Sequence, residues 1–152
     1  MLENVIEDKQ FAILMQKNIR DMIVYFFDKE QNFGILCKIE EITFDPELPK
    51  SINTEFRPLT LFFLAGYTFD TATIEGDFLI FEAGFGTDNI GSFVTVPLLS
   101  IMQIIIDETP VLINLASYEE NNSVQKEIDE NGVKNSMASF LSNPENSKFL
   151  KK

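Results

Sequence analysis

Residues 77–104 combine two β-type runs, a glycine-rich turn and a proline, and this order constrains the fold more than any other feature. Phe78–Phe85 and Phe93–Val96 are rich in residues that favour strands, and glycines interrupt the chain between them, which predicts a β-hairpin. Pro97 then suits the first turn of a helix. The apolar residues after it recur at helical spacing, so we expect a helix there. They are Leu98, Ile101, Met102, Ile105 and Ile106.

The rest of the body reads as one helix followed mainly by strands. The predicted elements are a helix over residues 4–29, a strand over 34–44, a proline-containing loop over 45–58, a strand over 59–69, a turn with a short strand over 70–76, a turn over 108–110 and a last strand over 111–116. The nearly continuous apolar run 59–69 suits a central strand that is covered on both faces. This order predicts an α+β fold with a mostly antiparallel sheet.

The helix predicted over residues 4–29 has an unusually wide apolar stripe, which Tyr25 and Phe27 extend. Such a stripe fits either a deeply seated core helix or a helix shared between the core and a second copy of the chain. Because the stripe exceeds what one small sheet covers, we expect a symmetric homodimer through this helix. The expected interface residues are Ile19, Met22, Ile23 and Phe26.

Charge and composition exclude several classes of function. The chain has 152 residues, a net charge of −12 and no histidine, which argues against nucleic-acid binding and removes histidine-dependent nucleophiles and zinc sites. Cys37 has no second cysteine to pair with and reads as a buried thiol in a reducing compartment. The acidic start and the short apolar runs predict a cytoplasmic protein without a membrane span. We expect no cofactor, no metal and no catalysis.

The composition changes after residue 116. Residues 1–116 carry a net charge of −11, whereas residues 117–152 are rich in Ser, Asn, Glu and Lys and carry a net charge of −1. The sequence therefore predicts a folded domain over 1–116 and a polar appendage over 117–152. Within the appendage, 124–131 and 135–142 suit short helices, and the chain closes with Lys148–Lys152, an apolar–basic segment of sequence KFLKK.

The predicted strand 78–85 alternates between two faces, with Leu79 and Phe81 on one and Glu82 and Gly84 on the other. One face packs on the core. The other is either covered as well or left as a groove with an aromatic floor that holds an extended peptide. The glycine spacing fits no phosphate-binding loop. Adjacent acidic pairs such as Glu40 and Glu41 do not form an acid–base dyad, so nothing here indicates an enzyme.

Two stretches of the body resemble the SspB family, stringent starvation protein B. These are FEAGFG at Phe81–Gly86 and TVPLLSIMQI at Thr95–Ile104, and a loop with LPKSI at Leu48–Ile52 precedes them. The resemblance implies an N-terminal helix, a strongly bent, mostly antiparallel sheet of the Sm-like half-barrel type, a homodimer and a groove for the ssrA degradation tag. Carried over to this chain, the groove residues are Lys50, Ile52, Phe81, Glu82, Ala83, Gly84, Phe85 and Gly86.

The resemblance implies an adaptor that delivers tagged polypeptides to a AAA+ unfoldase of the ClpX type. The tail motif Lys148, Phe149, Leu150, Lys151 and Lys152 would dock on the unfoldase, and two weak contacts joined in one chain would raise the local substrate concentration. The main alternative is a small acidic dimeric chaperone for a secreted protein, which does not need the tail motif. Because the body is acidic, we expect the groove to favour neutral or basic tags.

Overall fold

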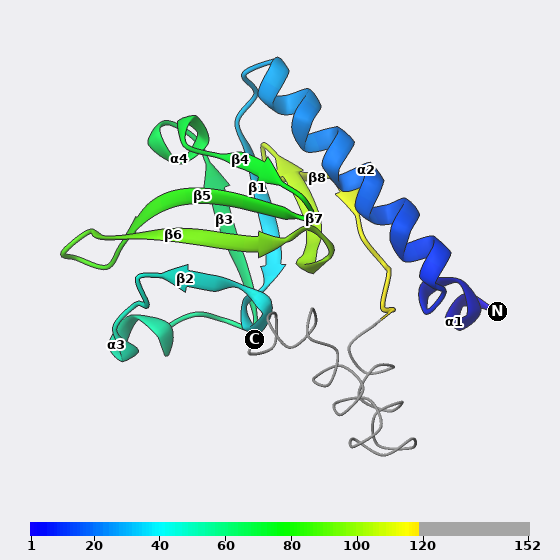
Figure 1. Cartoon of the computed structure of the whole chain (residues 1–152), viewed down its shortest axis with the longest axis horizontal. Coiled ribbons are helices and arrows are strands. Elements are labelled where there is room, and N and C mark those ends of the chain that lie inside the picture. Colours follow the sequence, from blue (N-terminus) through cyan, green and yellow to red (C-terminus); the bar gives the residue numbers. More distant parts are fainter. Residues whose placement is uncertain (119–152) are drawn as a thin grey trace, which may run out of the picture. The chain divides into compact units, whose positions relative to one another are not determined.

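The structure is a computed structural model, and it describes residues 1–118. Met1–Ser117 form one unit with helices at its N-terminal end and two antiparallel sheets, which confirms the predicted α+β class (Figure 1). The helices are α1 (Leu2–Ile6), α2 (Lys9–Asp28), α3 (Lys50–Asn53) and α4 (Tyr67–Asp70). The strands are β1 (Phe33–Lys38), β2 (Thr43–Asp45), β3 (Leu59–Leu64), β4 (Thr73–Glu75), β5 (Phe78–Phe85), β6 (Ile90–Pro97), β7 (Ile101–Ile106) and β8 (Thr109–Ile113). The predicted tail helices and the KFLKK motif lie outside the described residues.

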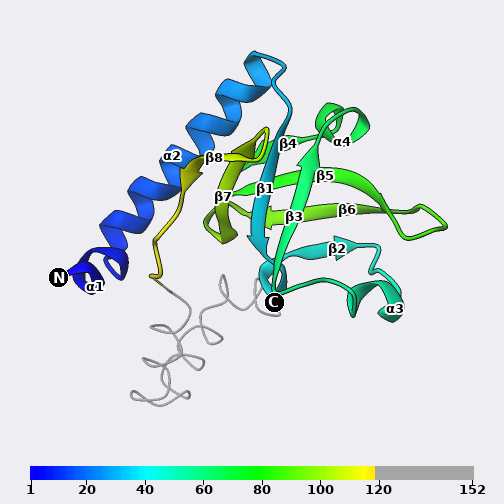
Figure 2. The same ribbon diagram turned by 180° about the vertical axis from the view of Figure 1, so that it is seen from behind.

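The two sheets are joined by two neighbouring chain segments, β1–β2 and β6–β7, which bend together and which we call the bent ribbon. Sheet A has the strand order β3-β1-β7-β8 and sheet B the order β2-β6-β5-β4. Strand β1 leads into β2 through a 3₁₀ turn at Ile39–Glu41, and β6 leads into β7 through a 3₁₀ turn at Leu98–Ser100. Because β1 pairs with β7 and β2 with β6, the paired segments turn the corner together (Figure 2). This sharp bend lets both sheets face one core.

The N-terminal helix is interrupted near its start. The sequence predicts one helix over residues 4–29, but the structure has α1 and α2 with a break at Glu7 and Asp8. The Asp8 side chain accepts a hydrogen bond of 3.0 Å from the backbone N–H of Phe11 and so caps α2. An aspartate at this position satisfies an N–H that has no partner inside the helix, which favours a new helix start here.

The helix predicted after Pro97 is wrong. The chain forms the 3₁₀ turn Leu98–Ser100 and then strand β7, which pairs with both β1 and β8. The run from Ile104 to Ile106 is β-branched at every position, which favours a strand. Ile101 and Ile104 are fully buried. In so apolar a segment, some apolar residues always fall at helical spacing. The spacing therefore could not distinguish a helix from a strand here.

The prediction of a covered central strand over 59–69 is also wrong. Strand β3 ends at Leu64 and forms the edge of sheet A, and α4 follows after Gly66, whose φ is +60°. The inward residues of β3, Phe62 and Leu64, are buried. Its outward residues remain on the surface, because nothing within residues 1–118 covers that face of the sheet.

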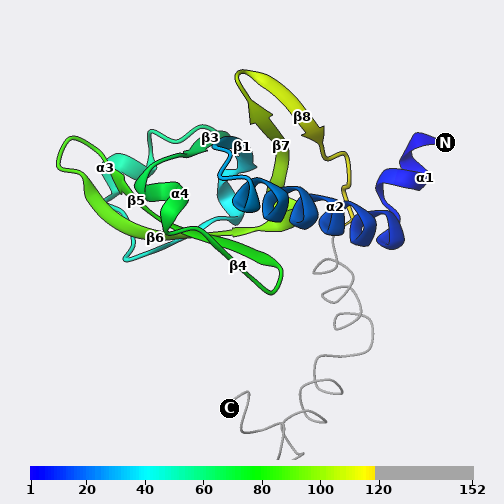
Figure 3. The same ribbon diagram turned by 90° about the horizontal axis from the view of Figure 1, so that it is seen from above.

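One hydrophobic core links α2 with both sheets. Helix α2 lies beside the β7–β8 hairpin, which extends beyond it (Figure 3). The core residues come from α2, both sheets and the two 3₁₀ corners, and the fully buried ones include Ile19, Ile23, Ile35, Leu64, Leu79, Val94, Val96, Leu98, Ile101 and Ile104. Cys37 lies among them with no exposed surface, which confirms the predicted buried thiol, and this burial raises the pKa of the thiol well above its ordinary value.

Candidate functional site

The predicted hairpin is formed by β5 and β6, which pair without a register shift from Phe78↔Pro97 to Phe85↔Ile90. Two positions at this end of the hairpin require glycine. Gly86 has a φ of +76°, a conformation that side chains other than glycine rarely adopt. A Cβ on Gly84 would lie 1.8 Å from the Oδ1 atom of Asn89, so the Asn89 side chain occupies that space.

Alternation along β5 divides the predicted peptide-binding residues between two faces. Leu79 and Phe81 point into the core, and Phe81 is only 1% exposed. We therefore correct the assignment of Phe81 from the peptide surface to the core, where its ring packs on Phe62. Glu82 and Gly84 lie on the opposite, outer face of sheet B.

The outer face of sheet B carries a hydrogen-bonded carboxylate. The Glu82 side chain accepts a hydrogen bond from the Tyr67 hydroxyl, and the Glu82 backbone N–H donates to Thr71 Oγ1 at 3.0 Å. The bond to Glu82 raises the pKa of Tyr67. Phe93, directly opposite Glu82 in the β5–β6 ladder, is half-exposed. An acidic group held between two exposed aromatic rings is suited to contact a cation.

A second group of predicted residues meets where α3 approaches the end of β5. A Cβ on Gly86 would lie 2.9 Å from Ile52 Cδ1, so these two residues are in close contact. Phe85 is half-buried and packs edge-on against Phe44 at a ring distance of 5.5 Å and against Phe56 at 6.0 Å. The structure thus brings Ile52, Phe85 and Gly86 together into one corner, which we call the aromatic corner.

The other predicted residues lie around this corner. Ala83 is half-buried on the same side of β5 as Phe85. Lys50, the first residue of α3, is exposed and forms no ion pair within residues 1–118. The Lys50 side chain is therefore available to bind an acidic group. A nearby cavity, in contrast, is lined by the carboxylates of Glu40 and Glu47.

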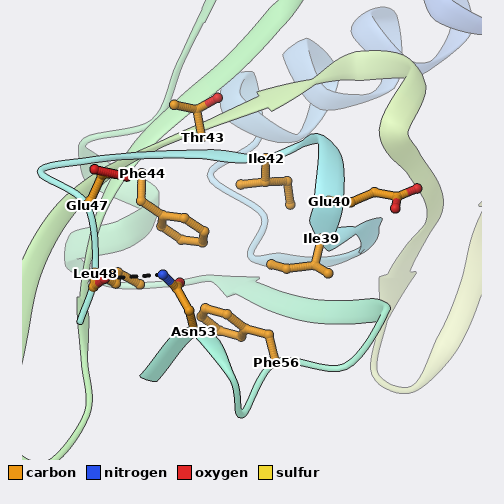
Figure 4. Close-up of a pocket in the computed structure, with 9 residues that line it drawn as sticks. All are labelled: Ile39, Glu40, Ile42, Thr43, Phe44, Glu47, Leu48, Asn53 and Phe56. Carbon is orange, nitrogen blue, oxygen red and sulfur yellow. Dashed lines mark hydrogen bonds between the residues drawn. The ribbon is translucent and has the colours of Figure 1, made fainter. Parts of the chain in front are cut away.

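A cavity of about 390 Å³ lies beside the aromatic corner, and sequence reasoning missed it (Figure 4). Phe44 and Phe56, which stack with ring centroids 5.5 Å apart, line it and also contact Phe85. The lining residues are Ile39, Glu40, Ile42, Thr43, Phe44, Glu47, Leu48, Asn53 and Phe56. They all lie within residues 39–56 but at irregular spacing, so neither a motif nor a periodic pattern marks them in the sequence.

The cavity combines an apolar interior with acidic sides. Asn53 uses its side-chain amide to hold the loop, since Nδ2 donates to the Leu48 carbonyl at 3.2 Å (Figure 4). Glu40 and Glu47 are exposed on opposite sides of the cavity, and within residues 1–118 neither forms an ion pair. An apolar pocket with unneutralised carboxylates at its mouth suits a side chain that has an aliphatic stem and a positively charged end, such as lysine.

Three of the four residues predicted for a dimer interface lie inside the single chain. Ile19 and Ile23 have no exposed surface and Phe26 is 6% exposed, because the sheets cover this face of α2. We therefore assign these three to the core. Met22 is half-buried and lines a shallow groove between α2 and the β7–β8 hairpin, together with Tyr25 and other residues.

The described residues contain no cluster of three or more potential metal ligands. Among residues 1–118, no helix combines the length and apolarity that crossing a bilayer requires. Comparison with protein-family models finds no match, and comparison with curated proteins finds no significant similarity. The SspB resemblance therefore remains a prediction from the residues themselves.

Proposed function

We propose that this chain is a non-catalytic cytoplasmic adaptor that binds degradation-tagged polypeptides and tethers them to a AAA+ unfoldase of the ClpX type. The observation that supports this most is the pairing of the 390 Å³ cavity with the aromatic corner across the shared Phe44–Phe56 wall. A peptide lying across this wall would place one side chain in the cavity and the next residues against Ile52 and Phe85. Apolar anchors of this kind are a common basis of peptide recognition.

The adaptor would act by linking two weak contacts. The body holds the tagged polypeptide, and the terminal segment Lys148–Lys152, which lies outside the described residues, binds the unfoldase. Joining both contacts in one chain raises the effective concentration of substrate at the unfoldase without any chemistry by the adaptor. A homodimer would double the number of both contacts in one complex.

The charge of the site determines which peptides it prefers. The body carries a net charge of −11, and Glu40 and Glu47 line the cavity, while Glu82 lies on the opposite face of β5, three residues from Phe85. This potential attracts basic peptides and slows the association of acidic ones, over a range of about 8–10 Å at physiological salt. We expect a lysine-bearing apolar peptide to bind more tightly at low salt, and its glutamate counterpart to bind weakly and to gain from salt.

Fluorescence anisotropy with this pair of labelled peptides tests the site. Glu47→Lys changes the cavity, Glu82→Lys changes the outer face of β5, and Glu75→Lys makes the same charge change on β4 as a matched control. We expect Glu47→Lys and Glu82→Lys to weaken the lysine peptide and strengthen the acidic one, with a smaller effect of Glu75→Lys. Equal binding of both peptides at every salt concentration, in all four chains, would refute electrostatic selection.

Degradation of a tagged reporter by the unfoldase and its protease tests the tethering. Deleting Lys148–Lys152 should leave peptide affinity unchanged and abolish the stimulation of degradation, because the segment follows the folded body in the chain. If the truncated chain stimulates degradation as strongly as the full chain, the docking role is wrong. If a single secreted protein instead co-purifies with the chain and is kept soluble by it, the chaperone alternative holds.

A further inference from the structure

Strand β3 exposes one full edge of sheet A. It pairs with β1 over six consecutive residue pairs, from Leu59↔Lys38 to Leu64↔Phe33, and with no other strand. Outside this ladder, the backbone of Leu59–Leu64 makes no hydrogen bond with another residue of 1–118. Its free N–H and C=O groups therefore form a template on which another strand could pair.

This edge lacks the features that usually prevent strand addition. The ladder with β1 has no bulge, and the strand contains neither a charged residue nor a proline. The whole stretch 58–69 is free of charged residues, although charged residues make up 24% of the chain. An acidic chain that associates with its own copies needs such a neutral surface, because elsewhere the like charges of the two bodies repel.

The outward side chains of β3 form an apolar stripe. Leu59 is 46% exposed, Leu61 42% and Phe63 65%. Neighbouring Gly34 lacks a side chain, so the Phe63 ring lies close to the β1 backbone, and half-buried Leu36 continues the stripe opposite Leu61. This surface is distinct from the peptide site, which lies around α3 and β5.

We propose that a second copy of this chain pairs with β3 in antiparallel fashion, with Leu61 of both copies at the twofold axis. Rotation about an axis perpendicular to the sheet keeps outward residues on the outer face, so odd-numbered residues pair with odd-numbered ones. Leu61 then faces Leu61 of the second copy, and Leu59 faces its Phe63. The nearest cationic groups, Lys38 and Arg57, lie at the same end of β3 and thus far from their own symmetry mates.

The exposed area indicates a weak dimer. If a large apolar residue offers about 150–200 Å² when fully exposed, the three side chains can bury at most roughly 280 Å² per copy, or somewhat over 500 Å² in total. Even with the backbone edge, this is below the range of about 1,200–2,000 Å² found for stable complexes. We therefore expect a dimer that forms at micromolar or higher concentration, independently of peptide binding.

Cysteine cross-linking tests the register. At the axis the two Leu61 Cα atoms would be about 4.5–5.5 Å apart, within the range for a disulfide. Leu61→Cys should therefore form a covalent dimer under mild oxidation. Phe63→Cys alone should not, because the two introduced thiols would be about 13 Å apart along the strands. A mixture of Phe63→Cys and Leu59→Cys chains should cross-link. Native Cys37 is buried and serves as the background control.

Sedimentation velocity over a concentration series tests the surface. Leu61→Lys should abolish the dimer, whereas Leu14→Lys, an equally drastic change at an exposed residue of α2, should leave it intact. Circular dichroism establishes that both variants fold. The proposal is overturned if the unmodified chain is monomeric up to about 100 µM, if Leu14→Lys rather than Leu61→Lys abolishes the dimer, or if Leu61→Cys cross-links no faster than Phe63→Cys.

Discussion

Asn114, just after β8, is fully buried, and its side-chain amide binds three backbone groups. Its Nδ2 atom donates to the carbonyl oxygens of Leu99 at 3.1 Å and Ile101 at 2.9 Å. Its Oδ1 atom accepts from the backbone N–H of Ala116 at 2.9 Å. These bonds fix the last described segment of the body to the 3₁₀ corner between the two sheets.

Replacing Asn114 by alanine should destabilise the fold strongly. The change leaves two carbonyl oxygens and one N–H in the interior without their partners, and each such group costs about 1–3 kcal/mol. Water that enters the vacated space recovers part of this, so we expect the free energy of unfolding to fall by about 3–5 kcal/mol. Urea denaturation should show a lower midpoint with an unchanged slope.

Asn114→Asp tests the direction of these bonds at nearly constant shape. A carboxylate cannot donate to Leu99 and Ile101, and burial beside two carbonyl oxygens would raise its folded-state pKa above the ordinary value of about 3.9. A raised folded-state pKa means that the variant is least destabilised at low pH and loses stability as pH rises through that pKa.

At pH 7 we therefore expect Asn114→Asp to be destabilised at least as much as Asn114→Ala, and at about pH 4 its deficit relative to the unmodified chain should shrink. Asn53→Asp, the same chemical change at an exposed residue, is the matched control and should cost less than about 1 kcal/mol. An Asn114→Asp chain as stable as the unmodified one at pH 7 would show that the two hydrogen bonds donated by Nδ2 contribute little to stability.

Three further predictions follow from burial and backbone conformation. Gly86→Ala should cost about 1–2 kcal/mol because of its positive φ, whereas Gly91→Ala, with open space around it, should stay within about 0.5 kcal/mol; thermal unfolding compares them. Phe81→Ala should cost about 3–5 kcal/mol and half-exposed Phe93→Ala less than about 1 kcal/mol in urea titrations; equal losses would contradict the inward direction of Phe81. Cys37 should react with iodoacetamide only as fast as the chain unfolds, and because its folded-state pKa is raised, stability should fall as pH rises above about 8.5 and the unfolded thiol ionises.

The sequence supported the hairpin prediction because two independent signals agreed there. Alternation put Leu79 and Phe81 on one face, and the glycines required a turn between the strands, as the structure confirms. The helix after Pro97 failed because a proline start and apolar spacing are also compatible with a 3₁₀ turn followed by a strand. Only long-range pairing of β7 with β1 and β8, which local pattern does not encode, decides between them.

The candidate site was harder to predict than the fold. The SspB resemblance grouped Phe81–Gly86 as one surface, but neighbouring strand residues point to opposite faces, so Glu82 and Phe85 serve different surfaces. The cavity was not predictable from local pattern at all. Phe44 and Phe56 read as scattered aromatic residues, and they acquire a role only because the bent ribbon brings β2 next to the loop after α3.

The proposed peptide site and the proposed pairing surface share strand β3. Leu61 and Phe63 point outward to the pairing surface, whereas Phe62 points inward and packs on Phe56 at 6.3 Å and on Phe85 at 6.4 Å. If pairing restricts the motion of β3, it also restricts Phe62 and, through the ring contacts of Phe62, the side chains of Phe56 and Phe85. Any such coupling is reciprocal: a peptide that tightens the dimer by some factor must bind the dimer more tightly than the monomer by the same factor.

Peptide titrations of the unmodified chain and of Leu61→Lys, combined with sedimentation of the unmodified chain with and without peptide, measure both factors. Identical peptide affinities for the two chains, and a dimer unaffected by peptide, would show that the two faces of β3 act independently.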